Sequence, residues 1–216
     1  MGSWTGTGSA GTIGHGLNAV PKMIIAKRRS ATRNWPVYHH TLGNDKKMYL
    51  NDTQASSSST NWNSTTPTSS VFSIGSADDI NGNGSTYVAY CFAEKPGYSK
   101  FGSYEGNGST DGTFVYTGFK PKFIIIKDSD NVRNWYNTDA VRDSFNYVRN
   151  TLTPNDSAAE FDNSNYNRVD FLSNGFKLRG GSSGVGNDTN GSGNTYIYMA
   201  FGQTLVGSNN TPCTAR

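Results

Sequence analysis

The chain has 216 residues, of which only 16% are charged and 34% are hydrophobic, and its net charge is +3. The small charge, the 12% of aromatic residues and the scattered Lys and Arg exclude a disordered charged tail and give no indication of nucleic-acid binding. The longest apolar runs have four or five residues, so no membrane insertion is expected, and two cysteines are too few for a disulfide framework.

Three glycines near the start, Gly6, Gly8 and Gly11, have the spacing of a dinucleotide-binding turn. That motif requires a strand before it, a helix after it and a βαβ unit around it. The flanking residues do not have these patterns. We therefore interpret the segment as a glycine-rich turn and predict no cofactor.

Two strands are the clearest elements of the first half of the chain. Residues 23–26 form a continuous apolar run, which is typical of a strand covered on both faces. Residues 86–92 alternate between two faces, one with Val88, Tyr90 and Phe92 and the other with Tyr87, Ala89 and Cys91. We expect Trp35 and Phe92 in the core, and we interpret Cys91 as a small buried residue.

Two histidines, His39 and His40, are adjacent on a predicted strand. Neighbours on a strand point to opposite faces, so we do not expect both to bind one metal ion within a chain. A site built from three copies of one histidine in a trimer is the alternative, and ordinary packed histidines are the favoured interpretation.

The chain repeats itself once, at an offset near 100 residues. The matching blocks, each with its counterpart, are residues 2–9 and 102–109, 21–27 and 121–127, 33–35 and 133–135, and 86–92 and 195–201. Four blocks in the same order indicate two copies of one module. The predicted domains are 1–100 for the first repeat with its linker, 101–203 for the second repeat and 204–216 for a C-terminal tail.

The second repeat has the same apolar run at 123–126, with Trp135 and Phe201 expected in the core. Residues 171–178 predict a hairpin, because Asn-Gly suits a tight turn. Residues 138–152 leave a short helix open as an alternative, since apolar residues there follow helical spacing behind Asp139. Frequent turns favour an all-β fold of two tandem β-sandwich-like repeats, each of about 100 residues.

Two loops resemble the first half of a calcium-binding loop, with oxygen-bearing side chains at alternate positions before a glycine. The weak candidate ligands are Asp79, Asn81, Asn83, Asp188, Asn190 and Ser192. The glutamate that completes such a loop is missing, because Tyr90 and Met199 stand in its place. We therefore predict no metal, and we interpret both loops as turns that lead into the next strand.

No arrangement of residues indicates catalysis. The 16 carboxylates fall mostly in polar turns, and the sequence has no nucleophile motif of the Ser-His-Asp type. Cys, His and an acid are not placed together, so a thiol nucleophile has no support. We predict no catalytic residues and a non-enzymatic protein.

Four aromatic residues, Trp62, Tyr116, Tyr147 and Tyr166, lie beside Asn, Ser or Thr rather than in apolar runs. An aromatic ring beside amides and hydroxyls is what sugar binding by stacking and hydrogen bonding requires. The alternative is that these rings cover the edges of the core. We select Trp62 and Tyr147 as the candidate glycan contacts.

Long stretches of the chain resemble a repeat of tail-fibre and tail-associated proteins of marine tailed bacteriophages. The resemblance lies in residues 86–104, in residues 115–127, and in residues 170–179 followed by 195–201. It covers nearly the whole chain. It implies a non-enzymatic, virion-borne β-sandwich protein, and it carries no catalytic residues.

The leading hypothesis is a bacteriophage virion structural protein, a tail or fibre appendage on the virion surface, with host surface glycans as a candidate partner. A capsid decoration protein of the same fold and a cell-derived carbohydrate-binding module are the alternatives. Small sandwiches expose edge strands, and this chain has few charges to protect them. We therefore expect a homo-oligomer, most simply a trimer, in contact with other virion proteins.

Overall fold

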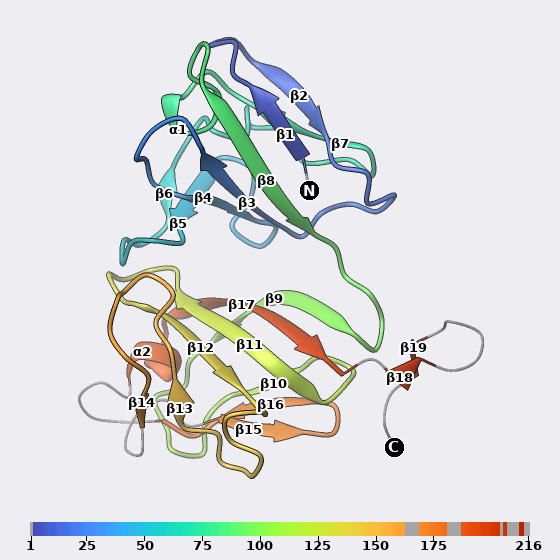
Figure 1. Ribbon diagram of the computed structural model, residues 1–216. Helices are drawn as coiled ribbons and strands as arrows, with labels where there is room; N and C mark the ends of the chain where they lie inside the picture. The colour runs from blue at the N-terminus through green and yellow to red at the C-terminus, as the bar shows by residue number, and fades with distance from the viewer. Residues whose placement is uncertain (1, 163–168, 181–186, 204, 207–211, 214–216) are drawn as a thin grey trace. The chain divides into compact units, whose positions relative to one another are not determined.

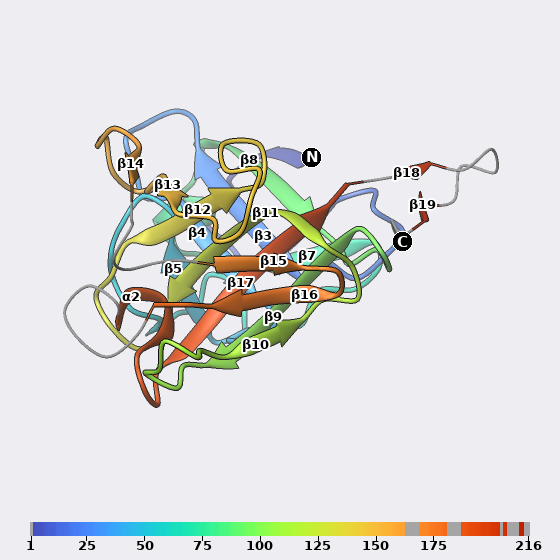
Figure 2. The same cartoon turned by 90° about the horizontal axis from the view of Figure 1, so that it is seen from below.

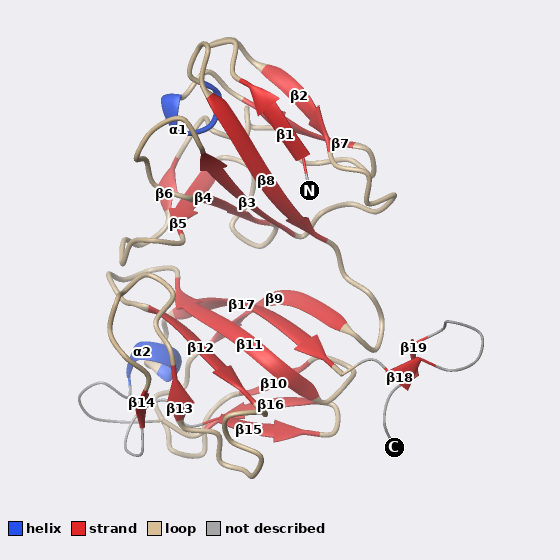
Figure 3. Cartoon of the chain, viewed as in Figure 1, coloured by secondary structure: helices blue, strands red, loops and turns tan. Residues whose placement is uncertain are grey.

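The computed structural model describes residues 2–162, 169–180, 187–203, 205–206 and 212–213. Within them the regular structure is mostly β-strand in antiparallel sheets, with two helices of four residues each (Figure 3). The predicted all-β, sandwich-like fold class is confirmed. No helix in this part of the chain has the length and apolar character needed to span a bilayer.

The chain divides into unit 1, Met1–Ala93, and unit 2, Glu94–Arg216. Unit 2 begins before residue 101, where the second repeat was expected to start. The reason is β9 (Ser99–Glu105), which pairs along its whole length with β17 (Thr195–Gly202). Of the predicted tail 204–216, the structure describes only β18 (Leu205–Val206) and β19 (Pro212–Cys213), and the rest lies outside the described residues.

Unit 1 has a central sheet in the order β1-β8-β3-β4-β5-β6 (Figure 1). Its strands are β1 (Gly2–Thr5), β8 (Thr86–Phe92), β3 (Met23–Arg28), β4 (Pro36–His39), β5 (Lys46–Tyr49) and β6 (Ser57–Ser58). A second sheet pairs β2 (Gly11–Gly14) with β7 (Val71–Ile74), and α1 spans Asp78–Asn81.

The core of unit 1 contains apolar side chains from both of these sheets. Ile24 and Ala26 alternate along β3, and Ala89 lies opposite Ala26 on β8. They cluster with Phe72 and Ile74 of β7, which the same period of two places on one face. Burial of these residues explains why the polar chain still forms a stable sandwich.

Unit 2 has a four-stranded sheet in the order β12-β11-β17-β9 and a three-stranded sheet in the order β10-β16-β15. Figures 1 and 2 show the three-stranded sheet on one side of the larger one. The remaining elements are β10 (Phe114–Tyr116), β11 (Pro121–Asp128), β12 (Trp135–Asp139), β13 (Asn150–Thr151), β14 (Phe161–Asp162), β15 (Val169–Leu172), β16 (Gly175–Leu178) and α2 (Asn187–Asn190).

The two units share a strand order. In unit 1 it is β1-β8-β3-β4, and in unit 2 it is β9-β17-β11-β12. Three of the four sequence blocks overlap paired strands of this order, and the fourth, 33–35 with 133–135, lies at the start of β4 and β12. The common order supports the interpretation of two related modules, and the tandem repeat remains an interpretation.

The aromatic residues expected in the core differ in how deeply they are buried. Trp135 is 1% exposed, as expected. Trp35, Phe92 and Phe201 are mostly buried, but each keeps some contact with solvent. Phe92 is three residues beyond the core residue Ala89, and the period of two therefore turns it to the opposite face of the sheet.

The hairpin at 171–178 is confirmed as β15 and β16, with Leu172 opposite Gly175. The helix that was left open over 138–152 does not form. Asp139 ends β12, and its carboxylate accepts hydrogen bonds from the backbone NH groups of Val141 and Arg142, at 2.9 Å each. A turn follows in place of a helix, and Val141 is 86% exposed.

Candidate functional site

The glycine-rich turn and the calcium-like loop of unit 1 are bound to each other through Asn81. This side chain, at the end of α1, is 1% exposed. Its Oδ1 accepts from the Thr7 backbone NH at 2.9 Å, and its Nδ2 donates to the carbonyls of Ser9 at 2.6 Å and Gly75 at 2.8 Å. The amide therefore fastens the turn to the loop.

Asn190 makes the same fastening in unit 2. Its Oδ1 accepts from the Asn107 backbone NH at 3.2 Å, and its Nδ2 donates to the carbonyls of Ser109 at 2.9 Å and Gly180 at 3.0 Å. A Cβ on Gly106 would lie 2.3 Å from the carbonyl oxygen of Gly191, so glycine is required by this close approach. In both units the glycine turn therefore packs closely against the following loop.

The two acids of the calcium-like loops have protein partners. Asp79 accepts hydrogen bonds from Lys47 Nζ at 3.0 Å and Tyr49 Oη at 2.6 Å. Burial raises the pKa of Asp79, but these hydrogen bonds and the nearby positive charges outweigh it and leave the pKa below its usual value. The Asp79 carboxylate therefore already has hydrogen-bond donors from the protein, Lys47 and Tyr49.

Asp188, the counterpart of Asp79, accepts a hydrogen bond from Tyr136 and lies 3.3 Å from Arg133 Nε. Here burial dominates and raises the pKa of the carboxyl. Asn83 and Ser192 are exposed. In the described part of the chain, no three or more His, Cys, Asp or Glu residues are grouped to hold a metal ion.

The histidine prediction needs a correction. His39 is the last residue of β4, so His40 lies in the following turn and does not alternate with it. The two ring centres are 5.2 Å apart. His39 is buried, and its Nδ1 lies 2.8 Å from Thr41 Oγ1. These contacts are those of histidines that pack within the fold.

Cys91 is partly buried and packs against the core of unit 1. Burial raises the pKa of its thiol to about 11. The thiol is therefore protonated at neutral pH and is a poor nucleophile.

The prediction that Trp62 contacts a glycan is wrong. Its side chain is 1% exposed and belongs to the core of unit 1. Its ring meets Tyr38 edge to face, with centres 5.7 Å apart. The polar neighbours of Trp62 form a tight turn, in which the Asn63 NH donates to the Thr60 carbonyl, and the turn directs the indole inward. Tyr166 lies outside the described residues.

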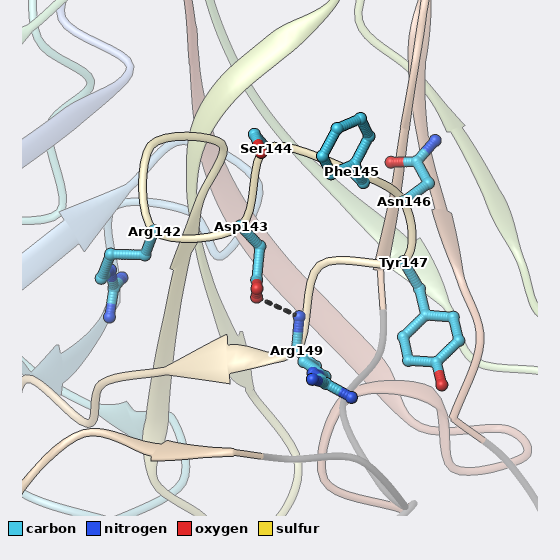
Figure 4. A pocket seen from close by; sticks show the side chains of 7 residues that line it. All are labelled: Arg142, Asp143, Ser144, Phe145, Asn146, Tyr147 and Arg149. Carbon is cyan, nitrogen blue, oxygen red and sulfur yellow. Dashed lines mark hydrogen bonds between the residues drawn. The ribbon is translucent and has the colours of Figure 1, made fainter.

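Tyr147 lies in solvent contact on a long loop of unit 2, residues 140–149, which follows β12. Tyr147 is 41% exposed and Phe145 is 84% exposed. The matching connection of unit 1, residues 40–45, is shorter. The two rings project from the loop in different directions (Figure 4).

Asp143 closes this loop on itself. Its carboxylate accepts from the backbone NH of Arg149 at 2.7 Å (Figure 4). It also accepts from the Asn150 backbone NH at 2.6 Å and from the Asn150 side chain at 3.1 Å. A single carboxylate thus joins the two ends of the segment that carries Phe145 and Tyr147. The loop conformation is held by these bonds before any ligand arrives.

The loop is also fastened to the edge of β15. The Asn146 side chain donates to the Phe171 carbonyl at 3.1 Å and accepts from the Phe171 NH at 2.9 Å, as a backbone amide would. Val148 pairs with Val169 through two backbone hydrogen bonds. The segment therefore covers part of an edge strand.

Arg142 anchors the start of the loop. Its guanidinium bonds to Asp139 at 2.6 Å and Glu160 at 2.7 Å, and it donates to Asn137 Oδ1 at 3.0 Å. Burial raises the pKa of Asp139. The hydrogen bonds from Arg142 and Val141 and the positive charge of Arg142 outweigh this effect, so the pKa of Asp139 is lowered.

Two hollows flank Tyr147. One of about 420 Å³ is lined by residues 142–147 and Arg149, and the other, of about 380 Å³, is lined by Thr110, Asn146, Tyr147, Asp170 and Arg179. These volumes are within the range of small-ligand sites. An aromatic ring beside amide, guanidinium and carboxylate groups can stack on a sugar and hydrogen-bond its hydroxyls. The sequence analysis did not select Phe145. The polar residues beside it were only a weak indication that its ring is exposed.

The family model described as "Domain of unknown function (DUF7483)" matches residues 1–204, which includes the glycine turns, Asn81, Asn190 and the 140–149 loop. The chain belongs to this family. No curated protein and no solved structure matches the chain.

Proposed function

We propose that the chain is a non-enzymatic structural protein of a bacteriophage virion, a tail or fibre appendage on the particle surface that contacts host surface glycans. The 140–149 loop carries the glycan part of the proposal, because it holds Phe145 and Tyr147 in solvent on a braced backbone. The resemblance of residues 86–104 and 115–127 to tail-fibre repeats supports the virion part.

The braces matter because ordering a mobile loop on binding costs free energy. Asp143, Asn146 and Arg142 hold the loop through backbone and side-chain bonds, so less order has to be created when a sugar binds. The hollows beside Tyr147 are lined by polar, charged and aromatic residues. A single site of this kind binds one sugar at about millimolar strength, about −4 kcal/mol, and several linked copies raise adhesion by roughly 10² to 10⁴.

A glycan array probed with the assembled protein tests this proposal. We expect Phe145→Ser and Tyr147→Ser each to reduce the bound signal at least tenfold, because each removes a stacking surface. Val141→Ser is the matched control, since Val141 is 86% exposed at the start of the same loop but has no aromatic ring. Equal binding by wild type and Tyr147→Ser would overturn the assignment of the site.

A further inference from the structure

The turn between β3 and β4 of unit 1 has a charge that its counterpart in unit 2 lacks. Together with the end of β3 it carries Lys27, Arg28, Arg29 and Arg33. The counterpart between β11 and β12 carries Lys127 and Arg133 but also Asp128 and Asp130. The first turn is therefore strongly basic, and the second has no net charge.

One carboxylate partly neutralises the basic turn. Asp78 accepts two hydrogen bonds from Arg28, at 2.8 and 2.7 Å, and one from Arg33 Nε at 2.9 Å. Lys27 Nζ donates to backbone carbonyls, including that of Arg28 at 2.7 Å and that of Arg33 at 3.2 Å. Arg29 is exposed, and it has no ion-pair partner among the described residues. Asp78 thus pairs with two of the four basic side chains, and the charge of Arg33 also acts on the nearby Asp79 carboxylate.

A hollow of about 540 Å³ lies beside this turn. It is lined by Gly2, Ser3, Lys27, Arg29, Trp35, Val88 and Tyr90. The strand register explains the grouping, because Lys27 lies opposite Val88 and Ile25 lies opposite Tyr90, which places these side chains on one face of the sheet. A second hollow of about 700 Å³ shares Lys27, Arg29 and Trp35 and continues along the turn.

Two aromatic rings belong to the hollow. Tyr90 is 41% exposed, and Trp35 is half-buried with Lys27 Nζ 5.8 Å from its ring centre. Asn51 fixes the backbone at Trp35, since its Oδ1 accepts from the Trp35 NH at 2.7 Å. Two aromatic residues and a guanidinium with no ion-pair partner among the described residues therefore line one hollow.

We propose that this hollow binds an acidic glycan, with Trp35 and Tyr90 against the sugar faces and Arg29 on a carboxylate or sulfate group. Arginine suits such anions because its planar guanidinium donates two parallel hydrogen bonds. The inference rests on the proposed function in that the ligand is a glycan. It uses no residue of unit 2, so it names a second site and the chemical class of its ligand.

A nucleic acid fits the same residues less well. Proteins that bind a single strand track its backbone with a basic groove over about 4–16 nucleotides. Here the positive charge is confined to one turn, and the net charge of the whole chain is only +3. A short anionic sugar matches a local charge beside two rings.

Unit 2 supplies substitutions that the same fold accommodates. The Ser129 NH donates to the Thr195 carbonyl as the Arg29 NH donates to the Thr86 carbonyl. Met199 lies opposite Ile125 as Tyr90 lies opposite Ile25. Arg29→Ser and Tyr90→Met therefore place residues in unit 1 that the related sheet of unit 2 already contains.

Isothermal titration of the full chain tests the inference with defined probes. These are a hexasaccharide of uronic acids, a sulfated hexasaccharide and a neutral hexasaccharide. We expect an acidic probe to bind, the neutral probe to bind at least tenfold more weakly, and added salt to weaken the acidic complex. Arg29→Ser should weaken acidic binding at least tenfold, and Tyr90→Met at least threefold, with unchanged melting temperatures.

Several outcomes would overturn the inference. If both variants bound the acidic probe with wild-type affinity, the proposed site would be wrong. If only Arg29→Ser lost binding, the site would be a charged patch without a role for the aromatic ring of Tyr90. Tighter binding of a 12-nucleotide single strand than of either acidic sugar would replace the ligand class. Tyr147→Ser separates the two proposals, because it should leave acidic-probe binding unchanged even if the loop site of unit 2 fails.

Discussion

Asn81 and Asn190 each fill a buried position at which two loops meet. Their side-chain amides satisfy backbone groups that would otherwise be buried without hydrogen-bond partners. The asparagine in the calcium-like spacing of these loops thus has a structural explanation, because its amide joins the two loops. Asn83 in unit 1 and Ser192 in unit 2 occupy exposed positions.

Asn81→Ala should lower the free energy of unfolding by about 1–3 kcal/mol, because backbone groups of Thr7, Ser9 and Gly75 lose their partner. Asn83→Ala is the matched control from the same loop, and an exposed substitution should change stability by less than about 0.5 kcal/mol. Urea unfolding measures both. Equal destabilisation by the two variants would contradict the role of Asn81 in joining the two loops.

The counterparts Asp79 and Asp188 have opposite pKa shifts, so they should affect stability in opposite directions. A carboxyl with a lowered folded pKa, such as Asp79, stabilises the fold above its unfolded pKa of about 3.9, and this stabilisation is lost as the pH falls through the folded value. For Asp188 the folded pKa is raised, so stability falls as the pH rises from about 3.9 through the folded value.

At pH 7, Asp79→Asn should therefore cost about 1–2 kcal/mol, since hydrogen bonds to a charged group are stronger than neutral ones. Asp188→Asn should cost less than Asp79→Asn or stabilise the protein, because it removes a buried charge and keeps an acceptor for Tyr136. Urea unfolding at pH 7 and between pH 3 and 5 provides the comparison. A larger loss for Asp188→Asn at pH 7 would show that the two sites are not opposed.

At the scale of elements, the 140–149 loop depends on one carboxylate for its shape. Asp143→Ala removes three hydrogen bonds that close the loop, while the sheets keep their pairing. We expect faster hydrogen exchange and faster proteolysis within residues 141–150, with a smaller effect elsewhere in unit 2. Ser144→Ala, an exposed neighbour, is the control. Unchanged exchange in Asp143→Ala would show that the brace is dispensable.

The strands were predictable because the period of two and the apolar runs are local signals. The hairpin at 171–178 was correct for a partly wrong reason. The turn residues are Ser173 and Asn174, and Gly175 begins β16, where a Cβ would lie 2.2 Å from the Val115 carbonyl oxygen. That close approach comes from a strand distant in sequence, so no local pattern could reveal it.

The site was predictable only in part, because local polarity does not determine burial. Trp62 and Tyr147 both have polar neighbours, yet one ring packs in the core and the other contacts solvent. The apolar spacing behind Asp139 left a helix open as an alternative, but Val148 is buried while Val141 and Phe145 are exposed. Hydrogen bonds of the Asp143 and Asn146 side chains hold this loop in place. They connect it to Asn150 and to Phe171 of the neighbouring strand β15, which the spacing of apolar residues does not reveal.

At the scale of the molecule, edge strands bear on assembly. Strand β10 lies at the edge of the three-stranded sheet, and its residues Phe114 and Tyr116 are 43% and 64% exposed with no charge between them. Such an edge favours pairing with another chain. Analytical ultracentrifugation should give three times the monomer mass, and Tyr116→Lys should shift the protein toward monomer. A wild-type protein that sediments as a monomer would refute the proposed assembly.

The location of the chain on an intact particle tests the proposed virion role most directly. Purified phage particles that carry its gene can be labelled with a gold-conjugated antibody against this chain and imaged by electron microscopy. The proposal predicts gold at the tail or its fibres, in groups that reflect a symmetric oligomer. Gold on the capsid shell, or particles that remain unlabelled, would contradict it.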